Sequence, residues 1–145
     1  MKTRLPYPTL APEPYQAMLR LESAIARSGL ERALVHLVKL RASQINGCLF
    51  CIEMHAKEAH ADGDTDERLH ALDAWQEAPY FTDRERAALA WTEAVTHIAE
   101  TRAPDAAYEE ARRAFSEKEL VELTWVIAAI NAWNRMAISM RAQPP

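Results

Sequence analysis

The two cysteines of this 145-residue chain lie three positions apart, and a histidine follows the second by four, as Cys48-x-x-Cys51-x-x-x-His55. A helix advances about 100° per residue, so the three side chains fall within an arc of roughly 60° on one face. The reactive form of cysteine is the thiolate, which the unpaired N–H groups at a helix start favour. His55 can take the proton of Cys51 or pair with its thiolate as an imidazolium, and Glu58, three residues later, can orient or charge that ring. The pattern predicts redox chemistry in which one cysteine attacks an electrophilic oxygen or sulfur and the other closes a disulfide.

The same residues also suit zinc binding, in a non-catalytic or regulatory protein. Cys48, Cys51 and His55 are ligand types that zinc prefers, and His36 or His60 would complete a set of four. The redox prediction is preferred, because the chain has no second C-x-x-C and a domain of this size does not need a metal to fold. Simple burial of the two cysteines as small apolar residues is the least favoured interpretation.

The elements that must position these residues are predicted to be helices. Three glycines and no sustained two-residue alternation argue against a sheet, whereas the abundant alanine, leucine, glutamate and arginine favour helix. We therefore expect one all-α domain over residues 1–145 with about seven helices. The first carries Met18, Leu21 and Ile25 and ends before Gly29. The others are expected near residues 31–43, 48–61, 65–76, 83–100, 104–114 and 117–141.

Helix starts are marked by three capping-box patterns and by the placement of proline. The patterns are Asp64-x-x-Glu67, Thr82-x-x-Glu85 and Ser116-x-x-Glu119. Four prolines fall within the first fourteen residues, and proline lacks an amide donor and restrains the residue before it. Residues 1–13 are therefore predicted to form an extended N-terminal arm.

Charge and hydropathy exclude several classes of partner. Seventeen basic and twenty-one acidic residues give a formal charge of −4, so there is no global electrostatic reason to bind nucleic acid or an anionic membrane. The basic start has no apolar stretch behind it, and the longest apolar run, residues 125–130, is far too short to span a membrane. We expect a cytoplasmic protein whose thiols are kept reduced.

At these cysteines the sequence resembles the carboxymuconolactone decarboxylase-like superfamily, in its alkylhydroperoxidase D-like (AhpD-like) branch. The signature of the branch is C-x-x-C-x-x-x-H, which Cys48, Cys51 and His55 match. The resemblance covers nearly the whole chain, and the segments that carry it besides the signature are residues 40–47, 81–89, 93–96 and 131–135. It implies an all-helical fold, a homo-oligomer (usually a trimer or hexamer), and thiol-dependent peroxidase activity. We therefore expect a contribution to antioxidant defence that uses no cofactor and no metal.

The resemblance also implies a role for each cysteine. Cys51 would attack a hydroperoxide, Cys48 would resolve the sulfenic acid, and an external thiol or dithiol reductant would restore the pair. The helix-start argument alone does not make this choice, because Cys48 lies closer to the helix start. Decarboxylase activity is not expected, because those members of the superfamily do not use the cysteine pair. A thiol–disulfide reductase with little activity on peroxides is the remaining alternative.

The chain departs from the family pattern at two positions. His36 stands where members commonly have a glutamate twelve positions before the first cysteine, and Phe50 stands where some have a histidine. His36 either replaces the glutamate as a relay base or fills a helix interface, since histidine serves both purposes. On the last predicted helix, Asn131 and Asn134 can reach the site or a subunit interface, and the interface is favoured.

Overall fold

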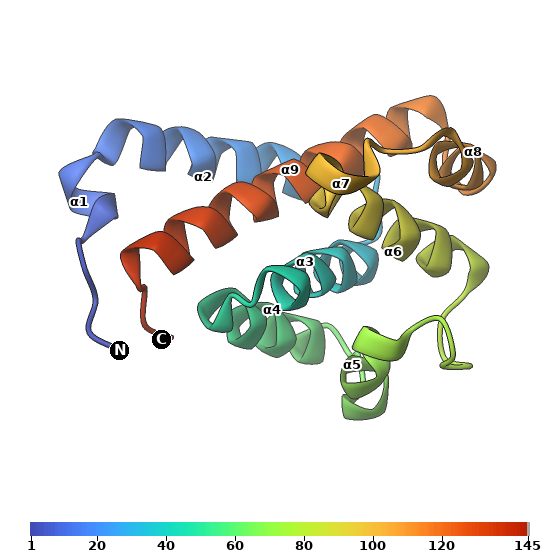
Figure 1. Ribbon diagram of the computed structural model, residues 1–145, viewed down its shortest axis with the longest axis horizontal. Helices are drawn as coiled ribbons and strands as arrows, with labels where there is room; N and C mark the ends of the chain where they lie inside the picture. The colour runs from blue at the N-terminus through green and yellow to red at the C-terminus, as the bar shows by residue number, and fades with distance from the viewer. Residues whose placement is uncertain (145) are drawn as a thin grey trace.

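In the computed structural model, residues 1–144 are described, and they form nine α-helices and one 3-10 helix with no strand (Figure 1). In chain order the elements are α1 (Tyr7–Leu10), α2 (Pro12–Ala26), α3 (Arg32–Asn46), α4 (Leu49–Ala61), α5 (Asp66–Ala71), η1 (Leu72–Ala74), α6 (Asp83–Thr96), α7 (Ile98–Thr101), α8 (Asp105–Ala114) and α9 (Glu117–Met140). The predicted all-α class is confirmed. The helix count is higher than predicted because the expected 83–100 helix breaks at His97 and because α1 forms at the start of the chain.

Helix α3 lies at the centre, between α9 on one side and α4 on the other, and it also packs against α6 (Figure 1). It is buried around most of its circumference, as expected of a helix whose apolar residues are not confined to one stripe. Leu34 and Val38 face a cluster shared with α2, α6, α8 and α9. Leu37 and Leu40 face a second cluster shared with α4, α5 and α6. The helix that precedes the cysteines is therefore held on several sides.

Two of the three predicted capping boxes are confirmed. The hydroxyls of Thr82 and Ser116 accept hydrogen bonds from the N–H three residues on, and the glutamate there accepts from the cap residue's own N–H. The third prediction is wrong by one residue, because Thr65 caps α5 by accepting from the Arg68 N–H at 3.3 Å. Asp64 instead accepts from the Arg68 guanidinium at 2.8 Å.

The extended arm is shorter than predicted and covers only residues 1–6. Helices α1 and α2 each contain a proline in their first turn. The first N–H groups of a helix have no acceptor within the helix, so proline loses nothing there and its fixed φ suits the position. The arm itself runs beside the end of α9, where the Arg4 N–H donates to the Met140 carbonyl at 2.9 Å (Figure 1).

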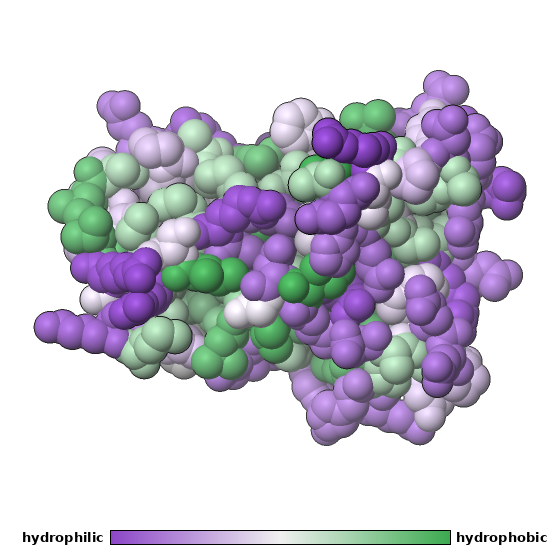
Figure 2. Space-filling view, viewed as in Figure 1, coloured by the Kyte–Doolittle hydropathy of each residue, from purple (hydrophilic) through white to green (hydrophobic). Residues whose placement is uncertain are grey.

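On the face shown in Figure 2, hydrophobic side chains form separate patches between hydrophilic ones. Among the described residues, no helix combines the length and the apolar character needed to cross a membrane.

Candidate active site

A left-handed glycine places the two cysteines. Gly47 ends α3 with φ +69°, a conformation that costs glycine little and most other residues a clash. The Cys48 N–H then donates back to the Ser43 carbonyl at 3.0 Å. The turn leaves Cys48 at the start of α4 and Cys51 in its first turn, as the spacing predicted.

The two cysteines are free, buried and in contact, with their Sγ atoms 2.7 Å apart. The pKa of Cys48 is lowered to about 7, mainly because the Cys51 thiol stabilises a neighbouring thiolate, helped by the Cys51 N–H and the Asn134 amide and opposed by burial. The pKa of Cys51 is raised, because that thiol holds the remaining proton beside Cys48 and is itself buried. The pair therefore loses one proton near neutral pH and keeps the other.

Beneath the pair, Asn134 belongs to a polar network inside the chain. Its side chain is fully buried, donates to Ser43 Oγ at 3.1 Å, and accepts from the Asn46 amide at 2.8 Å. Asn131 accepts from the same Asn46 amide at 3.0 Å. The interface role favoured for these two asparagines is therefore wrong for Asn134, whose buried amide instead favours the thiolate forms of the two cysteines.

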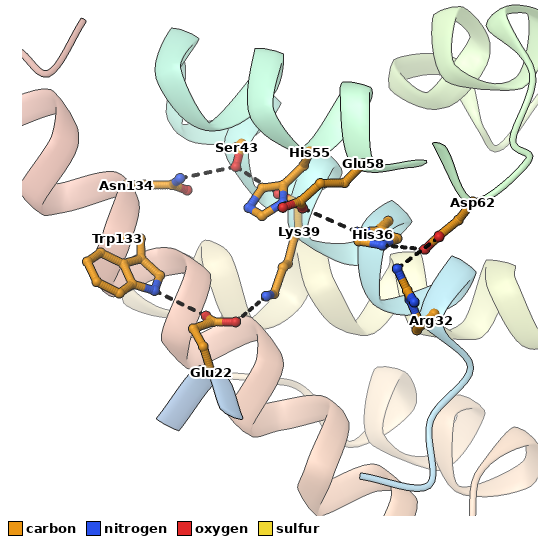
Figure 3. Close-up of polar contacts among 10 residues, drawn as sticks. All are labelled: Glu22, Arg32, His36, Lys39, Ser43, His55, Glu58, Asp62, Trp133 and Asn134. Atoms are coloured by element: carbon orange, nitrogen blue, oxygen red, sulfur yellow. Dashed lines mark hydrogen bonds and ion pairs between the residues drawn. The ribbon is translucent and has the colours of Figure 1, made fainter. Parts of the chain in front are cut away.

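A chain of polar contacts leads away from His55 across α4 and α3 (Figure 3). The Nδ1 atom of His55 lies 2.7 Å from Glu58 Oε2, and His36 Nδ1 lies 3.5 Å from the same oxygen. On its other side, His36 Nε2 lies 2.8 Å from Asp62 Oδ2, and Arg32 donates to Asp62 Oδ1 at 2.9 Å. Glu58 is thus the carboxylate shared by the two histidines.

The charged groups along this series of contacts, from His55 to Arg32, stabilise one another. The pKa of Glu58 is lowered well below its ordinary range, because the rings of His36 and His55 both favour its carboxylate. The pKa of His36 is raised, because Glu58 and then Asp62 favour the imidazolium more strongly than burial disfavours it. His36 is therefore part of an ionic chain and does more than fill a helix interface.

Cys51, His55 and Glu58 line one cavity of about 330 Å³. Its other walls are mostly aromatic and apolar: Tyr7, Tyr15, Leu19, Phe50, Met54, Trp133 and Ala137, with the ion pair Lys39–Glu22 among them. Tyr7 meets Tyr15 edge to face, and Tyr15 meets Trp133 in the same way, with ring centroids 6.1 and 5.7 Å apart. Trp133 also donates to Glu22 at 3.1 Å (Figure 3). The cavity is suited to a small molecule with an apolar part.

The structure brings together the predicted Cys48 and Cys51, and it links the predicted His55 to His36 through Glu58. It does not assemble the alternative zinc site. Among the described residues, the side chains that converge as a metal-ligand group are His36, His55 and Glu58, and this group includes neither cysteine. His36 is turned toward two carboxylates, and the exposed His60 pairs with Asp66 at the far end of α4.

Glu58, Asp62 and Asn134 complete the site. The sequence predicted that Glu58 could orient His55 and that Asn134 could reach either the site or a subunit interface, so only Asp62 was missed. For Asp62 the spacing carries a weak signal, since it lies one turn after Glu58 on the same helical face. Asn134 is distant in sequence and is brought in only by the packing of α9 on α3.

Comparison with known proteins places these features in a family. The model of the carboxymuconolactone decarboxylase family matches residues 12–94. The uncharacterized protein YdfG of Bacillus subtilis (strain 168) is 39% identical over 140 residues, which span 97% of this chain and 95% of YdfG. ATU0492 of Agrobacterium tumefaciens, of unknown function and described as a candidate antioxidant defence protein AhpD, superimposes with a TM-score of 0.96 at 49% identity over 99% of both chains. The debrominase Bmp8 in complex with 2,3,4-tribromopyrrole superimposes with a TM-score of 0.84 at 22% identity, and the match covers 94% of this chain and 73% of Bmp8. At this identity the likeness concerns the fold alone.

Proposed function

This chain belongs to the carboxymuconolactone decarboxylase family, and from that premise and the geometry of the thiol pair we propose that it is a thiol-dependent peroxidase. The observation that carries the proposal is the contact of two free, buried thiols beside a cavity that Cys51 shares with His55 and Glu58. A lowered thiol pKa and a partner sulfur within bonding reach are what peroxide reduction through a disulfide requires. The likeness to ATU0492 supports an antioxidant role.

The proposed cycle begins with a thiolate of the pair attacking one oxygen of a hydroperoxide. The O–O bond breaks, the attacked oxygen stays on sulfur as a sulfenic acid, and the other oxygen takes a proton and leaves as an alcohol or water. The second thiol then attacks the sulfenic sulfur, which releases water and forms the Cys48–Cys51 disulfide. An external thiol or dithiol reductant supplies two electrons and two protons and restores both thiols.

We assign the attack to Cys51 and the resolving step to Cys48. The lowered pKa belongs to Cys48, which by itself favours the opposite order. However, the sulfurs are in contact, so a proton can pass from Cys51 to Cys48, and the peroxide reacts at the sulfur it can reach. Cys51 lines the aromatic cavity together with His55, whereas Cys48 lines a neighbouring, smaller cavity of about 170 Å³. His55 supplies or accepts the proton, and Glu58 orients its ring.

A peroxide-consumption assay with a dithiol reductant tests the proposal. Cys51→Ser should reduce turnover to the uncatalysed background. Cys48→Ser should still consume one equivalent of peroxide and leave a sulfenic acid that a 1,3-diketone traps, but it should not turn over. His60→Ala, at an exposed residue outside the site, is the control and should be unchanged. Full activity in Cys51→Ser would contradict the proposal. If a sulfenic acid is trapped only in Cys51→Ser, then Cys48 is the attacking cysteine and Cys51 the resolving one.

The same thiol pair also supports a thiol–disulfide reductase, because a disulfide substrate can replace the peroxide in the first step. Measuring both substrate classes with one preparation separates the two functions. A rate on disulfides that exceeds the rate on every hydroperoxide would favour the reductase.

A further inference from the structure

One buried nitrogen near the site makes no hydrogen bond. His36 Nδ1 is the single buried side-chain nitrogen or oxygen atom among residues 1–144 that makes no hydrogen bond. Its nearest charged neighbour is Glu58 Oε2 at 3.5 Å, beyond an ordinary N–H···O distance. Unpaired buried polar atoms are uncommon because each costs the free energy of lost hydration, so this atom requires an explanation.

The other ring nitrogen of His36 determines what Nδ1 can do. Nε2 lies 2.8 Å from Asp62 Oδ2, and an ionised carboxylate only accepts hydrogen bonds, so Nε2 carries a proton. Glu58 favours a second proton on Nδ1, and a metal ion that displaces this proton would find a lone pair directed toward Glu58. A carboxylate that accepts from the second nitrogen of a histidine is the usual support of a metal ligand, because it fixes both the tautomer and the ring orientation. Asp62 is itself held by Arg32 at 2.9 Å.

Two further ligand atoms converge on the same point. One ligand atom from each of His36, His55 and Glu58 lies within 4.8 Å of the others, and His55 Nδ1 is 2.7 Å from Glu58 Oε2. Ligands bonded to zinc at 2.0–2.2 Å lie about 3.4 Å apart in tetrahedral geometry, so small side-chain rotations are sufficient. Two imidazoles and one carboxylate form a donor set that zinc uses in open sites, where a fourth position is left for water or substrate.

The surrounding charges permit a cation at this point. Lys39 lines the same cavity, but its ammonium group is paired with Glu22 (Figure 3). Arg32 is turned to the far oxygen of Asp62. The carboxylate of Glu58 is half-exposed, so an ion can reach it from solvent.

We propose that His36, His55 and Glu58 bind a divalent transition-metal ion of the zinc class, with Asp62 as the residue that positions His36. This inference departs from the absence of metal expected from the sequence. The site contains neither cysteine, so it differs from the zinc site considered for the thiol pair. Binding does not depend on the proposed peroxidase function. If that function holds, a bound ion would also occupy the histidine that serves Cys51.

Cobalt(II) titration of the reduced, metal-free protein tests this proposal, because cobalt is a spectroscopic substitute for zinc and its spectrum reports the ligand type. We expect one ion per chain and visible d–d absorption without the near-ultraviolet thiolate-to-cobalt band, and zinc should displace the cobalt. His36→Gln and Glu58→Gln should each weaken binding at least about tenfold, and Asp62→Asn should weaken it about 10- to 100-fold. The Cys48→Ser/Cys51→Ser double variant and His60→Gln should bind like the wild type.

Each variant is first compared with the wild type without metal, by circular dichroism and thermal midpoint, so that a loss of fold is not read as a loss of ligand. Failure of the reduced wild type to bind cobalt or zinc would overturn the proposal. So would a thiolate-to-cobalt band that disappears in the double cysteine variant, since the ligands would then be the thiols. Unchanged binding in a folded His36→Gln variant would exclude His36 as a ligand.

Discussion

At the scale of single residues, the chemistry depends on which atoms each side chain is turned toward. Cys48 and Cys51 share one proton across a 2.7 Å contact, and Asn134 supports the charge that remains. His36 stands where the family commonly has a glutamate, while Glu58 supplies a carboxylate between the two histidines. The carboxylate between the two histidines therefore comes from α4, and not from the position on α3 where the family resemblance places it.

The thiol pair is expected to react with an alkylating reagent as an acid with a pKa near 7. The pKa of Cys48 falls from 9.0 to about 7, so the thiolate fraction and the alkylation rate should rise as the pH increases from 6 to 8. Asn134→Ala should shift this midpoint upward, because it removes an amide that favours the thiolate. The rate of iodoacetamide labelling against pH measures the shift. Asn131→Ala shares the Asn46 contact and is the matched control, and a midpoint near 9 in the wild type would contradict the prediction.

At the scale of elements, the site depends on where three helices begin and end. Gly47 ends α3 and lets α4 begin at Leu49, which exposes the free N–H groups of α4 beside the cysteines. Helix α9 contributes Asn134 and Trp133, which contact residues more than eighty positions earlier in the sequence. The capping box of Ser116 and Glu119 sets the start of this helix. Local sequence therefore determines each helix, and the crossing of α9 over α3 brings their side chains together.

The α9 capping box should make a measurable contribution to stability. Ser116→Ala leaves the Glu119 N–H without its acceptor and should lower the free energy of unfolding by about 1 kcal/mol. Ser116→Asp keeps an acceptor oxygen and should remain within about 0.5 kcal/mol of the wild type. Urea unfolding followed by circular dichroism compares the three proteins. Equal stability of Ser116→Ala and the wild type would show that the cap is not needed.

At the scale of the whole molecule, α9 leaves an apolar stripe uncovered. Val121 is 59% exposed and Trp125 is 56% exposed, and Ala128 continues the same face. With Trp91 and Tyr108, these side chains line a groove of about 530 Å³ that is larger than the cavity beside the cysteines. An exposed stripe of this kind is typical of a protein–protein contact.

The homo-oligomer implied by the family resemblance is expected to use this stripe. Light scattering coupled to gel filtration should give a mass of three or six chains for the wild type. Trp125→Glu should move the mass toward one chain, because it places an unpaired charge in the contact. Tyr80→Glu, at a partly exposed aromatic residue outside the groove, should leave the mass unchanged. A monomeric wild type would contradict the prediction, and a Trp125→Glu variant with an unchanged mass would exclude the stripe.

The sequence by itself determined the helical class, two capping boxes, the turn at Gly47 and the pairing of Cys48 with Cys51 on one helix. These features depend on residues within a few positions of one another, so local spacing and propensity are enough to predict them. The predicted extended arm over residues 1–13 was a local feature that was partly wrong, because proline suits the first turn of a helix as well as an extended segment.

Only the tertiary structure decided which distant groups meet the thiols and the histidines. His36 reaches Glu58 because α3 packs on α4, and Asn134 reaches the cysteines because α9 packs on α3. Packing also keeps His60 outside the site, although both His60 and His36 are histidines and each could by its chemistry be a zinc ligand. Such contacts depend on how whole helix faces fit together, and no short stretch of the sequence contains that information.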